Sequence, residues 1–305
     1  MKFLSKSILR FVLTTLFVTI ISFLLIKISP IDPATAYARR FSITSTNEIE
    51  TIREEMGLNR PVYIQYVEWL SKIIKGDFGN SFVTSKSVFE EIKISMKNTF
   101  IIVITSMFIQ AFGALIVAQI SYLNEKNTIG KTLNKLSVIA ISTPPFIVAG
   151  IILELLAVKF RVINLSNNEG IARFLPAAIS LSINGIAYFG KILHDLISKN
   201  MNSNAVFYSK TFGFSEKKII RKYILCSSIK SILPTFMQMM GMCFAGTMII
   251  EQVFGIPGIG SLLIRAILLR DAPMIHGIVL CLGIIMSIFL IIADIFREGN
   301  KRREI

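Results

Sequence analysis

The sequence predicts an all-α integral membrane protein with six transmembrane helices, an external subdomain at residues 30–97 and a basic cytoplasmic loop at residues 199–230. Of its 305 residues, 53% are hydrophobic and 17% are charged, and the mean hydropathy is +0.64. Ordinary soluble domains are less apolar than this. The apolar residues also gather in runs of roughly 20, the length of helix that crosses a hydrocarbon core about 30 Å thick. Together these features exclude a soluble globular fold.

Six apolar runs are long enough to span a bilayer. They cover residues 8–29, 99–123, 136–158, 174–197, 232–254 and 274–296. Glycine and polar residues interrupt the fourth and fifth runs. The first run follows Lys2, Lys6 and Arg10, but it is longer than the apolar region of a signal peptide and no small-residue cleavage site follows it. We therefore expect it to stay in the protein as a membrane anchor.

Loop charges predict the orientation of these spans. With the N-terminus inside, the cytoplasmic segments are strongly basic and the external segments are nearly balanced, as the positive-inside rule requires. This places the protein in the cell membrane as a multi-pass chain with cytoplasmic N- and C-termini. The net charge of +14 then reflects topology and contact with membrane lipid, and no nucleic-acid partner is expected.

The external segments contain helical patterns of their own. Within 30–97, residues 47–56 and 62–75 are predicted helices, and Pro61 suits the first turn of the second one. The external loop 255–273 contains an amphipathic run at 261–269. No internal repeat or separate soluble domain is visible, so residues 1–305 are predicted to form a single membrane domain.

Motifs for catalysis or cofactor binding are missing from the sequence. Cys226, Cys243 and Cys281 lie far apart in or beside apolar runs, which favours packing roles. His194 and His276 fall at opposite membrane faces in the predicted topology and so cannot share a metal ion. No phosphate-binding loop is present, and the chain is not expected to bind or hydrolyse ATP itself. We therefore predict no catalytic residue, no cofactor and no metal site.

Three residues are candidates for a transport pathway. Glu154 is the only acid deep in a predicted span, where it either lines a cavity or makes a hydrogen bond between helices. Pro144 and Pro145 break or bend the third span, which either shapes a pathway or serves packing alone. The spans contain no chain of acidic or histidine residues of the kind that a proton-coupled carrier uses.

Several motifs recur along the chain in an order typical of one family. Residues 56–70 read MGLNRPVYIQYVEWL and residues 76–81 read GDFGNS, while Asn98-Thr99 and STPPF at 142–146 follow. EQVF at 251–254, PGIG at 257–260 and RDAP at 270–273 complete the series. Nearly end to end, the chain resembles the permease subunits of bacterial ABC importers of the dipeptide, oligopeptide and nickel group. The residues of this external signature are Gly57, Pro61, Gln65, Tyr66, Trp69, Gly76, Asp77, Phe78, Gly79, Glu251, Pro257, Gly258, Gly260, Arg270, Asp271 and Pro273.

The resemblance also implies a role for the cytoplasmic loop. In such importers this loop carries a coupling helix that inserts into an ATPase subunit, and here it falls near residues 204–212 with a glycine at its end. The residues concerned are Asn204, Ala205, Val206, Phe207, Tyr208, Lys210, Phe212 and Gly213. Asn204-Ala205-Val206 stands where the family has Asp-Tyr-Val. Ala205, Phe207, Tyr208 and Phe212 would face the partner, since an exposed aromatic face needs one; alternatively the loop folds back on its own helices.

The resemblance implies a permease that forms the translocation path with a second homologous permease. Two ATPase subunits would drive it, and an external solute-binding protein would deliver peptides, nickel or metal chelates. Two alternatives from the residues remain open: an ion-driven carrier acting alone, and a membrane assembly protein that transports nothing.

Overall fold

The protein folds into α-helices. The computed structural model describes residues 2–28, 32–160 and 171–301, and in that part of the chain the only strand-like pairing is an isolated antiparallel bridge between Asn80 and Ser87. The predicted all-α class is confirmed. The helices form two compact units, Met1–Thr99 with Ile256–Ile288, and Phe100–Gly255 with Phe289–Ile305. We call them the cap unit and the core unit.

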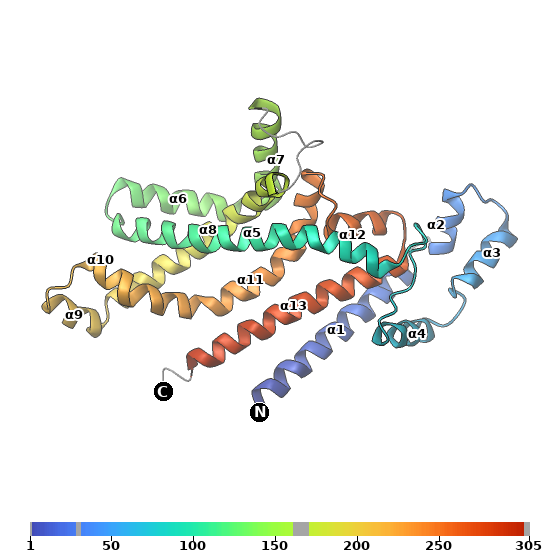
Figure 1. The fold of residues 1–305 in the computed structure, drawn as a ribbon, viewed down its shortest axis with the longest axis horizontal. Coiled ribbons are helices and arrows are strands. Elements are labelled where there is room, and N and C mark those ends of the chain that lie inside the picture. The colour runs from blue at the N-terminus through green and yellow to red at the C-terminus, as the bar shows by residue number, and fades with distance from the viewer. Residues whose placement is uncertain (1, 29–31, 161–170, 302–305) are drawn as a thin grey trace. The chain divides into compact units, whose positions relative to one another are not determined.

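The cap unit contains the first span and the helices of the external segments. Its elements are α1 (Lys2–Ile28), α2 (Pro33–Arg40), α3 (Thr46–Glu55), α4 (Val62–Ile74), the start of α5 (Val88–Leu123), α12 (Ile259–Leu268) and the first part of α13 (Ala272–Lys301). Thus α3, α4 and α12 cover the helices predicted at 47–56, 62–75 and 261–269. Figure 1 shows α1 alongside the first part of α13, and a hydrogen bond of 2.6 Å joins Ser22 Oγ to His276 Nδ1.

The core unit is built on three long helices. Its elements are the rest of α5, α6 (Thr128–Ser142), α7 (Pro145–Leu153), a π-helical segment (Glu154–Lys159), α8 (Ile171–Met201), α9 (Asn204–Thr211), α10 (Glu216–Ile219), a second π-helical segment (Ile220–Ile224), α11 (Leu225–Val253) and the end of α13. Its apolar core joins α5, α8 and α11 through buried residues such as Ala118, Phe189 and Met240. Ser182 of α8 adds a buried polar link, because its hydroxyl lies 3.0 Å from Ser106 Oγ of α5.

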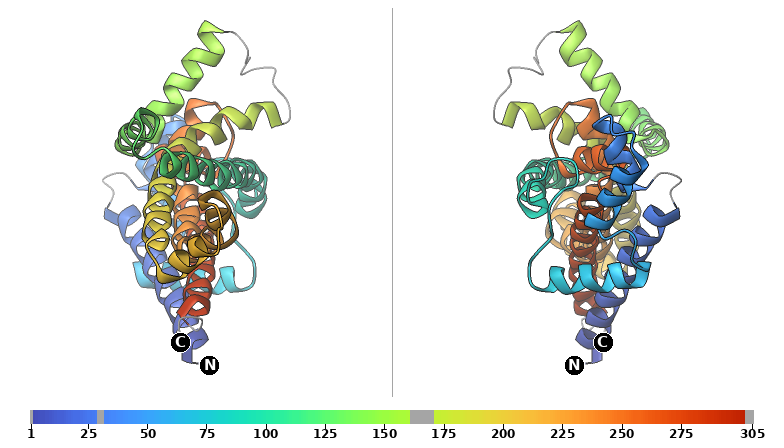
Figure 2. Two further views of the ribbon diagram at one scale, coloured as in Figure 1. Left: turned by 90° about the vertical axis from the view of Figure 1, so that its left-hand side faces the viewer. Right: turned by 90° about the vertical axis from the view of Figure 1, so that its right-hand side faces the viewer.

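The predicted third span is broken in two. Helix α6 ends at Ser142, α7 begins at Pro145, and the pair is bent by 102° at the break, which Figure 2 shows as α7 leaving the end of α6. Proline explains the break, because Pro144 and Pro145 lack the N–H groups that would continue the helical hydrogen bonds. Asn184 of α8 compensates: its Nδ2 donates to the carbonyls of Ala140 (2.8 Å) and Thr143 (2.6 Å).

Within the described residues, four helices are long and apolar enough to span a membrane, and a fifth is if the bent pair counts as one. The four are Ser7–Ile28, Val88–Leu123, Glu216–Val253 and Ala272–Asn300. Helix α8, which covers the predicted fourth span, has 31 residues but is not among them, and it contains the polar residues Asn184, Lys191 and Asp195. The chain is an all-α membrane protein, and a span at α8 stays a prediction.

The two bonds from Asn184 predict a measurable contribution to stability. Replacing Asn184 with leucine, which has a similar volume, removes the donor to both carbonyls; the carbonyl of Ala140 keeps its bond from the N–H of Thr143, and the carbonyl of Thr143 loses its donor. We expect a loss of about 1–3 kcal/mol in stability, the cost of a carbonyl group left unpaired. Thermal unfolding of the detergent-solubilised protein measures it. Asn202→Leu, at an exposed position after α8, is the matched control, and equal melting temperatures for the two variants would contradict the assignment.

Candidate functional site

Helix α9 is a short helix that interrupts the connection between α8 and α11. It runs from Asn204 to Thr211, within the predicted range 204–212. Ser203 precedes it in an extended conformation, with φ −79° and ψ 154°, as is usual for a residue before the first helical turn. A helix of eight residues is too short to be stable alone in water, so contacts with its neighbours must hold it.

The end of α9 is fixed by Gly213. This glycine has φ +79°, its N–H donates to the carbonyl of Lys210 (2.9 Å), and the N–H of Phe214 donates to the carbonyl of Ser209 (3.2 Å). This pair of bonds is the Schellman arrangement, which needs a left-handed residue and therefore favours glycine. The chain consequently leaves α9 in a defined direction towards α10.

Val206 anchors α9 to the core unit. Its side chain is 3% exposed and belongs to the same buried apolar cluster as Met201 of α8, Ile219 of α10 and Ile224 before α11. That cluster continues without interruption to Ala118 of α5. Buried apolar groups at this density move together, because opening a void between them is costly. Val206 therefore packs α9 against the same apolar core as the long helices.

The opposite surface of α9 is uncovered. Phe207, Tyr208 and Phe212 are 65%, 63% and 81% exposed, and Ala205 is exposed as well. The rings of Phe207 and Tyr208 lie 5.9 Å apart in an edge-to-face contact. All four residues expected to face a partner thus lie on the surface, while Val206 points inward. The other predicted members of the element, Asn204, Lys210 and Gly213, are also exposed.

A basic surface continues beyond α9. Its members Lys217, Lys218, Arg221 and Lys222 are exposed, and Lys218 Nζ lies 4.7 Å from the centroid of the Phe214 ring. The single acid of this stretch, Glu216, lies 3.4 Å from the hydroxyl of Tyr122 on α5. The surface around α9 therefore combines exposed rings with positive charge, which suits a partner with a groove and acidic groups.

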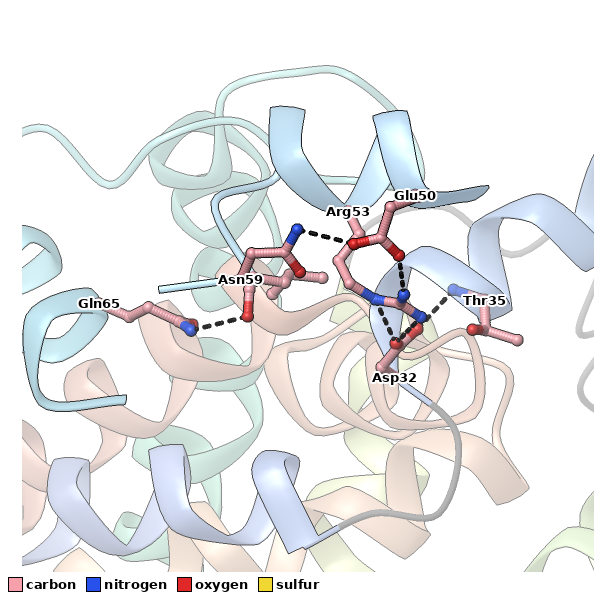
Figure 3. Close-up of polar contacts among 7 residues, drawn as sticks. Asp32, Thr35, Glu50, Arg53, Asn59 and Gln65 are labelled. Atoms are coloured by element: carbon pink, nitrogen blue, oxygen red, sulfur yellow. Dashed lines mark hydrogen bonds and ion pairs between the residues drawn. The ribbon is translucent and has the colours of Figure 1, made fainter. Parts of the chain in front are cut away.

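In the cap unit, an ion pair that the sequence did not reveal joins α2 to α3. Asp32 precedes α2 and accepts from the backbone N–H of Thr35 (2.6 Å), while Arg53 of α3 donates to the same carboxylate from Nε (2.9 Å) and Nη2 (2.6 Å). Figure 3 shows Arg53 between Asp32 and Glu50, which it also contacts. Burial raises the pKa of Asp32, but the hydrogen bonds from Thr35 and Arg53 outweigh it and hold that pKa below its ordinary value of 3.8.

Helix α4 packs on α1 and α13 through aromatic rings. Trp69 and Tyr66 each lie with their ring centroids 5.2 Å from that of Phe23 on α1, and Tyr66 Oη lies 3.0 Å from Thr19 Oγ1. The ring of His276 stacks on Phe23 at 3.7 Å. His276 is thus buried among aromatic groups. Tyr66 and Trp69 are signature residues, and their contacts account for aromatic side chains at these positions.

The remaining signature residues lie in turns and caps of the cap unit. Asp271 accepts hydrogen bonds from Ser81 Oγ (2.5 Å), from the N–H of Phe82 (3.1 Å) and from the N–H of Met274 (3.4 Å). It therefore caps the first turn of α13 and also holds the loop at 81–82, which precedes α5. Burial raises the pKa of Asp271 although these bonds oppose the shift. Gly57, Gly76 and Gly79 adopt positive φ, and the side chain of Asp77 accepts a hydrogen bond from the N–H of Gly79. The side-chain amide of Gln65 donates to the carbonyl of Arg60. The carbonyl of Pro257 accepts from the side-chain amide of Asn98.

Phe78 and Pro273 line a cavity of about 300 Å³ beside Trp69. Pro61 immediately precedes α4, Gly258 precedes α12, Gly260 is buried in its first turn, and Arg270 connects α12 to α13. Sequence positions 57–79 and 257–273 are therefore brought together in one unit.

The pathway candidates and Glu251 lie in the core unit. Glu154 begins the π-helical segment after α7 and its side chain is exposed, whereas Glu251 of α11 is fully buried. In the described part of the chain no group of three His, Cys, Asp or Glu side chains is arranged to hold a metal ion. The structure thus places Glu154 on a surface of the core unit.

The features above define a multi-pass helical membrane protein in which a short helix with exposed aromatic side chains connects two long helices. Residues 110–304 match the model of the family "Binding-protein-dependent transport system inner membrane component". Residues 1–103 match the model of its N-terminal region, "Binding-prot-dependent transport system membrane comp, N-term". The chain belongs to this family of transport-system membrane components. It is an ABC importer permease of the plasma membrane and not a catalytic enzyme.

Curated relatives cover nearly the whole chain. The nickel import system permease protein NikB of Staphylococcus aureus (strain USA300) is 29% identical over 292 residues, which is 93% of this chain and 84% of the relative. NikB of Staphylococcus aureus (strain MRSA252) is 28% identical over 305 residues, 96% of this chain and 90% of the relative.

The Asp32–Arg53 pair predicts acid sensitivity of the α2–α3 region. Because the folded pKa of Asp32 lies below 3.8, the pair stabilises the fold above that pH and its contribution is lost as the pH falls through the folded pKa. Both side chains are about one third exposed, at 35% and 28%, so solvent screening limits the effect to about 1 kcal/mol or less.

Asp32→Asn keeps the hydrogen bond from the N–H of Thr35 and removes the charge. Hydrogen-exchange protection of α2 and α3 should therefore be lower at pH 7 and should depend less on pH in the acid range. Asp77→Asn, outside the pair, is the control. The pairing has no such role if wild type and D32N show the same pH profile.

Proposed function

We propose that this permease works by alternating access, with a second homologous permease beside it, two ATPase subunits on the cytoplasmic side and a solute-binding protein on the outside. The observation that carries the proposal is helix α9, which exposes Phe207, Tyr208 and Phe212 while Val206 ties it to the core of α5, α8 and α11. A partner that grips the rings and changes shape would move the long helices through Val206. Membership of a binding-protein-dependent transport family supports the same arrangement.

The proposed orientation places both termini and α9 in the cytoplasm. The exposed cations around α9 support it, because basic loops are retained inside. The cap unit's α2, α3 and α4 then face the outside and would receive the solute-binding protein. An ion-driven carrier acting alone and a non-transporting assembly protein are the alternatives, and neither accounts for a docking helix anchored in the core.

For substrate we propose nickel, free or chelated, with short peptides as the competing class. The relatives named nickel import permeases support this choice, since they match over 93% of the chain. The solute-binding protein is expected to select between the two classes. Uptake of radioactive nickel in the presence of excess short peptides decides between them: competition by peptides would favour the second class.

Docking is tested by Phe207→Asp, which puts a charge on the exposed face of α9 without touching the core. We expect at least a tenfold loss of ATPase subunits copurified with the permease and a matching loss of nickel uptake, because an interface centre tolerates an unpaired charge badly. Gly213→Val, which strains the left-handed end of α9, should act in the same direction. Phe41→Asp is the control for copurification, since Phe41 is an aromatic residue of the cap unit that directly follows α2 and is 53% exposed. Unchanged copurification and uptake in F207D and G213V would overturn the coupling role of α9.

Transmission is tested separately by Val206→Ala. This change leaves the exposed rings in place and opens a small void in the cluster that joins α9 to the spans. ATPase copurification should stay normal while nickel taken up per ATP hydrolysed falls several-fold in reconstituted vesicles. Thr211→Ala, at an exposed position of α9 outside the predicted partner-facing residues, is the control. A V206A transporter with the wild-type ratio of uptake to hydrolysis would show that Val206 does not carry the movement.

A further inference from the structure

A groove in the cap unit lies between α1, α12 and α13. Its volume is about 490 Å³, and its walls include Leu25 and Ile26 of α1, Ile267 of α12 and Val279 of α13. Among the described residues that line it, Arg270, in the connection between α12 and α13, is the only charged one. Nothing in the transport mechanism proposed above uses this groove.

The groove reaches to a depth at which a bilayer is hydrocarbon. The candidate span in α1 ends at Ile28, and Ser22, which also lines the groove, lies six residues before that end, about 9 Å along the helix axis. In α13, Val279 lies seven residues after Ala272, about 10 Å from the start of that span. Water does not fill an apolar groove at such a depth, so the groove must hold an apolar group.

Several apolar side chains that line the groove are exposed, so the groove is accessible from outside the cap unit. Leu25 is 63% exposed, Ile267 is 51% exposed and Leu268 is 76% exposed. A flexible acyl chain can enter such an open apolar groove from the surrounding lipid, because it carries no polar group that would need a hydrogen-bond partner there.

Arg270 is available to bind an anion at the rim. Within the described residues no carboxylate forms an ion pair with its guanidinium, and the carboxylate of the adjacent Asp271 is directed at Ser81 and Phe82. The backbone of Arg270 has φ 58°, an uncommon conformation for a residue with a side chain. A guanidinium matches the geometry of a phosphate group, with which it forms two parallel hydrogen bonds.

We propose that this groove binds a phospholipid from the leaflet on the side of α2, α3 and α4. One acyl chain lies between α1, α12 and α13, and the lipid phosphate is held by Arg270. The lipid fills an apolar space that α1 and α13 leave open and thereby supports the packing of α12 against them.

The experiment is native mass spectrometry of the full-length chain released from nanodiscs of dioleoylphosphatidylglycerol. We expect one phospholipid retained by the wild-type chain, and at least threefold lower retention in Arg270→Gln, which removes the charge, and in Val279→Phe, which narrows the groove. Arg270→Lys should retain an intermediate amount. Arg265→Gln is the matched control, because Arg265 is an exposed arginine of α12 that does not line the groove.

A second arm uses the unmodified chain and is therefore independent of whether a variant folds. Nanodiscs that contain an equal amount of dioleoylglycerol offer the same acyl chains without phosphate, and we expect the wild-type chain to retain the phospholipid at least threefold in preference. Equal retention of the two lipids would overturn the role of Arg270. Absence of any retained lipid in the wild type, or wild-type retention in both R270Q and V279F, would overturn the proposal as a whole.

Discussion

The structure depends on one constraint: a helix that ends or breaks within a membrane protein must find partners for its free backbone groups inside the protein. Asn184 meets this need at the break between α6 and α7, where it donates to two carbonyls. Thr99 meets it at the start of α12, where its hydroxyl accepts from the N–H of Ile259 at 2.8 Å. Asp271 does the same for α13. Each of these residues joins elements distant in sequence, so satisfying the backbone also fixes the fold of its unit.

The same constraint explains how a helix as short as α9 is held in place. Helix α9 has eight residues, and the Schellman bonds at Gly213 close its last turn locally. One buried side chain, that of Val206, is enough to pack α9 against the core of the unit. Its other side is then free to present aromatic rings, which bury large areas at little entropic cost when a partner covers them. A longer helix would add stability without adding to this function.

Elements with strong local patterns were predictable from the sequence, and long-range pairs were not. Apolar runs and turn residues indicated the spans, α3, α4, α12 and the break at Pro144–Pro145. The size of the bend was not predictable, because it depends on what α8 offers to the broken end. The pair Asp32–Arg53 spans 21 positions and the pair Ser81–Asp271 spans 190, and no sequence periodicity connects such residues. Buried Val206 within a polar loop was similarly hidden, because a single valine among exposed neighbours carries no pattern.

Exposed apolar residues have different meanings in the two units because their surroundings differ. Leu268 of α12, 76% exposed, lines the groove beside α1 and α13, where lipid would cover it at little cost. Phe212 after α9, 81% exposed, is close in sequence to Lys210, Lys217 and Lys218, which require water or phosphate around them. An aromatic ring held in water beside such charges is unfavourable until a protein surface covers it. The charges near each apolar residue, and not its exposure alone, therefore separate a lipid-facing surface from a docking surface.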